Sequence, residues 1–263
     1  MDHNLYTRIV EQIETLPAHG LCDLEKATLM NRVDTKFILS ARLLPTILAE
    51  LGGCYSALEI GGERCFRYES TYFDTEDYRL YHMHHNGHLN RHKVRMRRYV
   101  DSDIQFLEVK FKNNKKRTIK RRIELDEPAV NLGEHVDFLK SLKVPSPGEL
   151  QPCLHNRYRR IALASEERGE RLTIDIGLSN AIPGFDQSEK ALTEIAIVEL
   201  KQSTLNRDTP FYRLARSMGV RPSGFSKYCM GMTLALRHRE NWKYNRFKPV
   251  LRRLAHQQKI GRG

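Results

Sequence analysis

Eight stretches of the chain alternate between apolar and polar residues, which is the pattern of a β-strand with two different faces. The clearest is KVRMRRY at 93–99, where Lys93, Arg95 and Arg97 alternate with a valine and a methionine. As a strand, this stretch places three cations on one face and apolar side chains on the other. The predicted strands span 31–39, 64–73, 91–100, 104–112, 117–125, 156–164, 171–178 and 193–202.

Between the strands, apolar residues that recur every three or four positions predict helices. Capping residues begin three of them: Ser40 for the helix through Leu51, Asp74 for the helix through Tyr81, and Asp208 or Thr209 for the helix that starts at Pro210. The other predicted helices span 4–16, 132–142 and 225–238. Helices combined with mostly antiparallel strands predict an α+β fold.

Charged residues occupy the polar face of almost every predicted strand. For one strand alone, a solvated sheet face is the simplest explanation. When many strands share the pattern and helices cover their apolar faces, the charged faces can instead surround a lumen. Burying so many cations is prohibitive unless a polyanion, a metal ion or water fills that lumen. The charged positions are Arg32, Asp34, Lys36, Arg91, Lys93, Arg95, Arg97, Glu108, Lys110, Lys112, Lys120, Arg122, Glu124, Arg157, Arg159, Arg171, Asp175, Glu199 and Lys201.

The mixture of charges on these faces indicates a phosphate site that uses a divalent metal. Cations clamp phosphate oxygens, while interleaved carboxylates are suited to hold the metal. The chain has no Walker-type GxxxxGK[ST] loop and no evident Ser/His/Asp arrangement. Phosphate would therefore be held by side chains from many strands and not by one glycine-rich loop.

The net charge of +12 over 263 residues, with a pI of about 9.5, favours an anionic partner. Residues 237–263 hold nine Lys/Arg residues and one Glu, a net charge of +8. Such a basic stretch is typical of a solvated extension. We predict a folded domain at 1–236 and a basic tail at 237–263 that contacts polyanion, an acidic membrane surface or a membrane partner protein.

The five cysteines are odd in number and lack the spacing of metal ligands, which indicates reduced thiols. The first residues have neither the basic nor the apolar region of a secretory signal. No apolar run approaches the 18 residues of a transmembrane helix. These features predict a cytoplasmic protein without a transmembrane segment.

Eight motifs, in order, resemble the VTC domain, the polyphosphate polymerase domain of the triphosphate tunnel metalloenzymes. The first, RVDTKF at 32–37, is similar to the Arg-x-Glu-x-Lys-Tyr opening of that domain, with Asp34 where Glu is usual. The resemblance implies a closed barrel of eight antiparallel β-strands, a triphosphate tunnel with a charged lumen and helices packed outside. The other motifs are YFDTEDYRLY (72–81), KVRMRRY (93–99), LEVKFK (107–112), RYRRIAL (157–163), RLTIDIGL (171–178), IVELK (197–201) and FSKYCMG (225–231).

The resemblance also implies which side chains form the site. It assigns Mn²⁺ or Mg²⁺ to Glu199, with Glu108 as a second ligand. It implies phosphate binding by Arg32, Lys93, Arg122, Lys201 and Ser226. The residues implied to act on the reacting phosphates are Lys36, Arg95, Arg97, Lys110, Arg159, Arg171 and Lys227.

The implied activity is transfer of the γ-phosphoryl group of ATP to a growing polyphosphate chain. Phosphoryl transfer needs in-line positioning and charge neutralisation more than a side-chain nucleophile. Two alternatives stay open: a tunnel hydrolase acting on inorganic or nucleoside triphosphate, and a non-catalytic polyphosphate-binding module. The expected partners are ATP, triphosphate and polyphosphate, with no sequence-specific nucleic acid.

Overall fold

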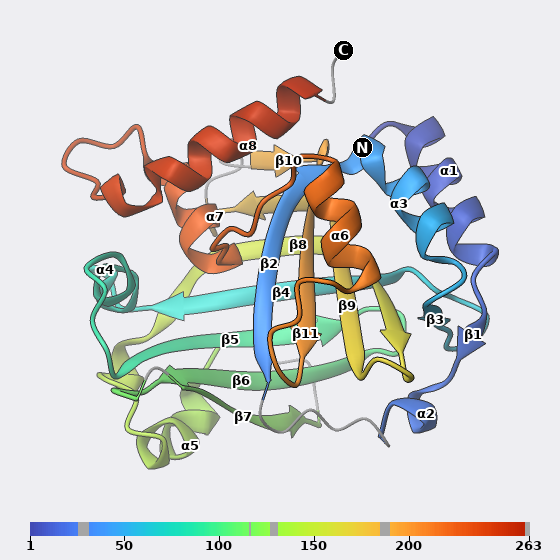
Figure 1. The fold of residues 1–263 in the computed structure, drawn as a ribbon. Coiled ribbons are helices and arrows are strands. Elements are labelled where there is room, and N and C mark those ends of the chain that lie inside the picture. Colours follow the sequence, from blue (N-terminus) through green and yellow to red (C-terminus); the bar gives the residue numbers. More distant parts are fainter. Residues whose placement is uncertain (26–31, 116, 127–130, 185–189, 261–263) are drawn as a thin grey trace.

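One large sheet runs through the computed structural model, which describes residues 1–25, 32–115, 117–126, 131–184 and 190–260 (Figure 1). The strands are β1 (Ala18–His19), β2 (Val33–Ser40), β3 (Ser56–Leu58), β4 (Phe66–Asp74), β5 (Arg91–Tyr99), β6 (Ile104–Lys112), β7 (Thr118–Leu125), β8 (Gln151–Ser165), β9 (Glu170–Ala181), β10 (Lys190–Leu192) and β11 (Ile195–Gln202). The α-helices are α1 (His3–Glu14), α2 (Leu21–Glu25), α3 (Leu44–Leu51), α4 (Arg79–His85), α5 (Val136–Ser141), α6 (Pro210–Ser217), α7 (Lys227–Leu236) and α8 (Lys248–Ile260). Short 3-10 turns are η1 (Ala41–Leu43), η2 (Gly133–His135), η3 (Pro147–Glu149) and η5 (Asn245–Phe247).

The main strands follow one another in the order β2-β11-β9-β8-β4-β5-β6-β7, and every neighbouring pair is antiparallel. The α+β class is confirmed, but the expected closed barrel is wrong. Within the described residues, β2 and β7 are the edges of an open sheet and do not pair with each other. Alternation along a strand predicts which side chains share a face, whereas closure depends on the tilt and stagger of all strands together.

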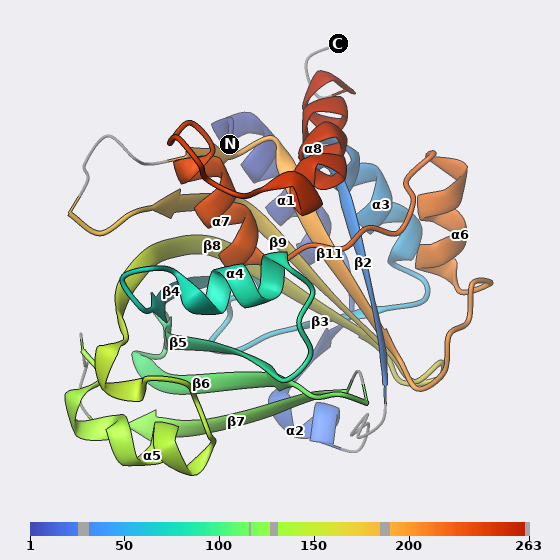
Figure 2. The same cartoon turned by 90° about the vertical axis from the view of Figure 1, so that its left-hand side faces the viewer.

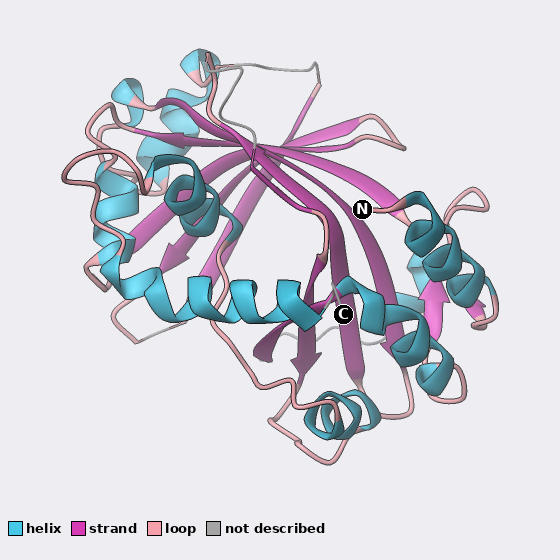
Figure 3. Ribbon diagram, turned by 90° about the horizontal axis from the view of Figure 1, so that it is seen from above, coloured by secondary structure: helices cyan, strands magenta, loops and turns pink. Residues whose placement is uncertain are grey.

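Helices cover the outer face of the sheet, which carries the apolar half of each alternating strand. Helices α1, α3 and α6 pack there on β2, β8, β9 and β11, with Phe37, Ile161 and Leu172 fully buried. Helix α5 packs on β5 and β6 through Leu139 and Leu107. Seen from above, the helices lie around the fan of strands (Figure 3). In the described ranges, no helix combines the length and hydrophobicity needed to cross a bilayer.

One end of the inner face, opposite these helices, is apolar and is filled by α7. Ile38 and Ile197 of neighbouring strands pack there with Tyr228 and Met232 of the helix. Strand β9 contributes Leu178 because its pairing with β8 shifts register next to Gly177, which has φ 61°. This bulge turns Leu178 inward, whereas strict alternation would keep it on the outer face.

The buried carboxylate of Asp74 joins β4, α4 and α7. The sequence predicted Asp74 as the cap of a helix over 74–81, but α4 begins at Arg79 and Asp74 ends β4. Its carboxylate nonetheless accepts the backbone N–H groups of Leu80 and Tyr81, each at 2.8 Å. It also accepts the hydroxyl group of Tyr228 on α7. These bonds set the position of α7 relative to the sheet.

The described part of the basic segment 237–263 is folded, so its interpretation as a solvated extension is wrong. Helix α8 packs against β2 and β11 and crosses one end of the molecule (Figure 1). Leu254 is only 3% exposed, and the side-chain oxygen of Gln257 accepts the backbone N–H of Ser40 at 2.9 Å. The apolar positions of α8 were not recognised in the sequence, because cations outnumber them in this segment. A domain boundary at 236/237 stays a prediction.

Replacing Leu254 with Ala is expected to destabilise the whole fold by about 2–5 kcal/mol, because it leaves a cavity between α8 and the sheet. Urea unfolding of the full chain measures this. The control is Lys259→Ala, which changes an exposed position of the same helix and should alter stability by about 0.5 kcal/mol or less. Equal stability of Leu254→Ala and the unmodified protein would mean that α8 is not part of the cooperative fold.

Candidate functional site

The first of three ion-pair groups on the inner face surrounds Glu108 of β6. Its fully buried carboxylate accepts Nε of Arg95 at 2.7 Å and pairs with Lys120. Arg97 lies 3.9 Å away. Burial alone would raise the pKa of Glu108, but Arg95, Arg97 and Lys120 hold it well below its usual range. Strands β5, β6 and β7 thus share one buried anion among three cations.

The second group is centred on Glu199 of β11. Lys36 lies directly opposite Glu199 in the β2–β11 ladder and forms an ion pair with it. Lys201, on the same strand, contacts the other carboxylate oxygen at 3.2 Å. Burial would raise the pKa of Glu199, but the two lysines hold it well below its usual range. With 21% of its side chain exposed, Glu199 is more accessible than Glu108.

The third group attaches α7 to the sheet through Asp175 of β9. Arg160 of β8 makes a bidentate pair with this carboxylate, with N···O distances of 2.6 and 2.8 Å. Lys227, the first residue of α7, binds the same carboxylate. The preceding residue, Ser226, accepts Nζ of Lys93 at 2.8 Å. The start of α7 therefore lies directly over the charged part of the inner face.

Lys110 shows that the sheet curls into a trough. Lys110 lies on β6 and Glu199 on β11, which are separated by five inter-strand spacings in the sheet. In a flat sheet the two strands would be about 24 Å apart. Arg95, burial and Arg97 hold the pKa of Lys110 well below its usual range, while the nearby carboxylates of Glu199 and Glu108 oppose this shift. The two arms therefore approach one another, as Figure 2 shows for β2 and β11 beside β5–β7.

The structure brings most of the predicted site residues to this inner face. Arg32 is hydrogen-bonded to Asp34 at 2.9 Å, and burial, together with the charge of Arg32, lowers the pKa of Arg171. Arg122 lies on the exposed strand β7 with its guanidinium 4.3 Å from the ring centre of Phe106. Arg32 itself lies just before β2. The predicted residues that share the inner face or the start of α7 are Lys36, Lys93, Arg95, Arg97, Glu108, Lys110, Arg122, Arg171, Glu199, Lys201, Ser226 and Lys227.

Arg159 is the exception, because the structure places it on the outer face. Its guanidinium lies 5.0 Å from the ring centre of Tyr6 on α1. Arg160 takes the inner position and contacts Asp175. The cation-rich run RYRR has arginines on both faces, so charge alone could not identify the inward one. A signal was present: the buried Ile161 and Leu163 share the outer face with Arg159.

Sequence reasoning also missed the central roles of Asp175 and Lys120. Both were predicted on the charged face, but only the structure shows that Asp175 joins β8 to α7 and that Lys120 completes the group around Glu108. These contacts join residues far apart in sequence. No local spacing could have predicted them.

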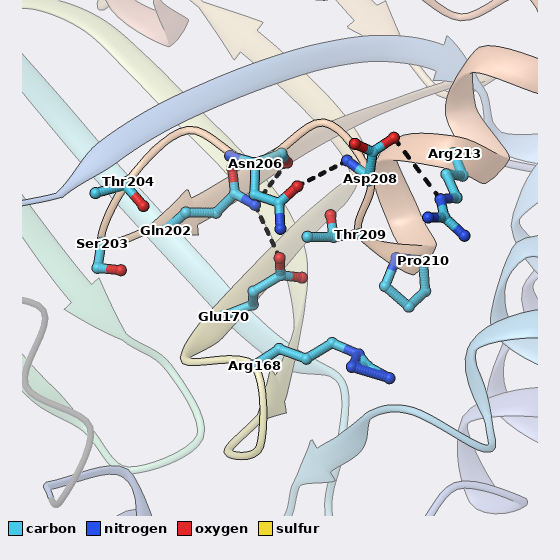
Figure 4. Close-up of a pocket in the computed structure, with 10 residues that line it drawn as sticks. All are labelled: Arg168, Glu170, Gln202, Ser203, Thr204, Asn206, Asp208, Thr209, Pro210 and Arg213. Atoms are coloured by element: carbon cyan, nitrogen blue, oxygen red, sulfur yellow. Dashed lines mark hydrogen bonds and ion pairs between the residues drawn. The ribbon is translucent and has the colours of Figure 1, made fainter.

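A separate pocket of about 550 Å³ lies where β9, β11 and α6 meet (Figure 4). Its walls are joined by their own hydrogen bonds, including the one from Gln202 to Glu170 at 2.8 Å. None of its described lining residues belongs to the predicted site. The lining residues are Arg168, Glu170, Gln202, Ser203, Thr204, Asn206, Asp208, Thr209, Pro210 and Arg213.

A comparison of the sequence with models of protein families gives a match. The model of the VTC domain matches residues 31–236, which is most of the chain. The chain belongs to the VTC domain family. A comparison with curated protein sequences found no significant match.

Solved structures that are distant in sequence resemble parts of this VTC domain. A Hippeastrum protein, described as a proposed adenylyl cyclase with a dominant triphosphatase activity, is 16% identical with a TM-score of 0.50, over 78% of this chain and 97% of that chain. A proposed adenylate cyclase from Bacillus halodurans is 15% identical with a TM-score of 0.49, over 74% and 94%. One from Vibrio parahaemolyticus is 11% identical with a TM-score of 0.45, over 77% and 99%. The Hippeastrum likeness supports the fold.

The carboxylates of this VTC domain fit a metal ion that binds together with phosphate better than a preformed metal cage. Among the described residues, no three His, Cys, Asp or Glu side chains converge on one point. Mg²⁺ commonly uses one or two carboxylates and completes its coordination with substrate phosphate oxygens. The partly exposed Glu199 suits this arrangement, while Glu108 is already engaged by three cations.

Proposed function

We propose that the protein is a metal-dependent polyphosphate polymerase that transfers the γ-phosphoryl group of ATP to a polyphosphate chain. The observation that supports it is the concave inner face, where cations from several strands and from α7 outnumber the carboxylates that pair with them. Such a surface is suited to a linear polyanion, since each phosphate can meet cations from both arms of the sheet.

In this proposal the chain contributes positioning and charge neutralisation. Arg95 and Arg97 are buried beside Glu108, so their guanidinium groups are already oriented before the substrate arrives. Lys227 is likewise held by Asp175 at the start of α7. Fixed cations of this kind stabilise charge on the phosphoryl oxygens without reorganising during the reaction. The hydroxyl oxygen of Ser226 accepts a hydrogen bond from Nζ of Lys93. Its own proton remains available for donation to a phosphate oxygen.

Glu199 is the residue proposed to hold Mn²⁺ or Mg²⁺. A divalent cation bound with the triphosphate supplies Lewis-acid assistance to phosphoryl transfer. Lys36 and Lys201, the present partners of Glu199, would then be available to phosphate oxygens. A role for Glu108 as second ligand is less well supported by the geometry, because its carboxylate is fully buried among its three cations.

Hydrolysis of triphosphate is the second candidate. The Hippeastrum structure with the same fold is described as having a dominant triphosphatase activity, and the same cations would serve with water as the acceptor. Incubation with ATP and Mn²⁺, followed by separation of polyphosphate, ADP and phosphate, distinguishes the two. Polymer with ADP supports the polymerase. Phosphate without polymer supports the hydrolase, and bound but unchanged ATP supports a binding module.

Triphosphate binding is expected to take up protons, because a bound anion favours the charged form of Lys110. In the free protein Arg95, burial and Arg97 hold the pKa of this lysine well below its usual range. Affinity should therefore fall as pH rises from the pKa of Lys110 in the free protein toward the unperturbed lysine value of about 10.4. Calorimetry in buffers of different ionisation enthalpy measures the uptake. Lys110→Met should reduce it, and heats that do not depend on the buffer would contradict the prediction.

A further inference from the structure

A second group of cations continues the inner face beyond Lys93, toward α4. Arg91 lies two residues before Lys93 on β5 and therefore shares its face, about 6.6 Å further along the strand. Lys112 is directly opposite Arg91 in the β5–β6 ladder. Neither Arg91 nor Lys93 belongs to the described ion pairs around Glu108, Glu199 and Asp175. The row of positive charge thus extends past the proposed triphosphate site.

The C-terminal segment adds Arg246 to this group. The guanidinium lies over Gly87, just after α4: a Cβ atom built on Gly87 would be 2.2 Å from Nη1 of Arg246. The segment is held in place by the buried Phe247 and by Trp242, whose ring stacks on Tyr81 with centroids 4.6 Å apart. Arg246 lies outside the region matched by the family model. Its position is nevertheless determined by packing.

Arg91, Lys93 and Arg246 differ from the cations of the ion-pair groups in having no described carboxylate as a partner. Among the described residues, no Asp or Glu lies within 4 Å of Arg91, Lys93 or Arg246. Burial, together with the nearby charges of Lys93, Arg91 and Arg246, lowers the pKa of His84 on α4 to about 2. His84 is therefore neutral and adds no charge of either sign at physiological pH.

A purely structural role accounts for only part of this arrangement. Arg91 donates to the carbonyl group of His88, which follows α4, and Arg246 packs nearby. A helix C-terminus carries about half a negative elementary charge. That charge is too small to offset Arg91, Lys93 and Arg246 together, so the group retains an excess of positive charge.

We infer that Arg91, Lys93 and Arg246 form a second anion subsite, which binds the part of a polyphosphate chain that extends from the triphosphate site toward α4. This inference rests on the proposed function. Lys93 connects the two subsites, because it also donates to Ser226 at the start of α7. An inorganic triphosphate held at the ion-pair groups is too short to occupy both subsites. A longer chain reaches Arg246.

The test compares Arg246→Gln with Arg252→Gln, which removes the same charge from an exposed position on α8. Affinities for inorganic triphosphate and for long-chain polyphosphate are measured by calorimetry with the full chain. Arg246→Gln should weaken long-chain binding about fivefold and reduce the salt dependence of log K by about one ion, by analogy with nucleic acids. Its triphosphate affinity should stay unchanged, and Arg252→Gln should change neither affinity. Arg246→Lys should retain most of the long-chain affinity.

Two outcomes would overturn the subsite. Unchanged long-chain affinity would show that Arg246 does not meet the polymer. Equal losses for both ligands, together with a lower melting temperature, would show that Arg246 only stabilises the end of α4. Failure of the proposed function has a different signature: the unmodified protein would produce no polymer from ATP, while the difference between the two variants in direct polyphosphate binding could still be measured.

Discussion

Replacing Glu199 with Gln is expected to reduce metal-dependent turnover of ATP by a factor of about 100 or more, since Lewis-acid assistance contributes several kcal/mol. The substitution keeps the shape of the side chain and removes its charge. It also removes the anion that orients Lys36 and Lys201. Rates measured over a range of Mn²⁺ concentrations separate these effects. A metal ligand predicts a weaker apparent affinity for Mn²⁺, with partial recovery at high concentration.

The control for this experiment is Glu69→Gln. Glu69 pairs at 3.3 Å with Arg157, away from the inner face, and both side chains are substantially exposed. This variant removes the same charge from the same chain and should turn over ATP normally. If Glu199→Gln lowers the rate but leaves the Mn²⁺ dependence unchanged, Glu199 positions the lysines and does not hold the metal. Normal activity would remove Glu199 from the site.

Replacing Glu108 with Gln is expected to have the largest effect on stability, a loss of about 3–5 kcal/mol, because it leaves buried cations without their anion. Arg95, Arg97 and Lys120 all face this carboxylate, which is fully buried. Triphosphate should restore part of the loss by supplying a new anion to the same cations. Urea unfolding at neutral pH, with and without triphosphate, measures both quantities.

The difference in stability between the unmodified protein and Glu108→Gln should depend on pH with a definite sign. The pKa of Glu108 in the folded protein lies below its unfolded value. The contribution of the Glu108 carboxylate to folding stability is therefore complete above its pKa in the unfolded chain, about 4.3. It is lost as pH falls toward its pKa in the folded protein. The gap between the unmodified protein and Glu108→Gln should narrow in acid. The control, Glu124→Gln on the exposed strand β7, should change stability by about 0.5 kcal/mol or less. A similarly small loss for Glu108→Gln would contradict the buried-anion account.

The sequence by itself determined which side chains share a face on most strands. A strand has a period of two, so Lys93, Arg95 and Arg97 had to point the same way wherever the strand lay. The 3-10 turn and α3 that follow Ser40, and α6 at Pro210, were predicted from equally local signals, although neither Ser40 nor Thr209 forms the expected side-chain cap. The family resemblance, carried by motifs in these same strands, is confirmed by the match to the VTC domain. The roles of individual residues in binding and catalysis stay predictions.

Only the tertiary structure decided how these faces meet. The sheet is open where a closed barrel was expected. Arg160, and not Arg159, points to the inner face, and the basic C-terminal segment contains helix α8. The tertiary structure also joins Asp175 to Lys227 across 52 positions of the chain. Such contacts depend on the curvature of the whole sheet and on packing between distant segments. Local periodicity contains information on neither, because it describes one strand or helix at a time.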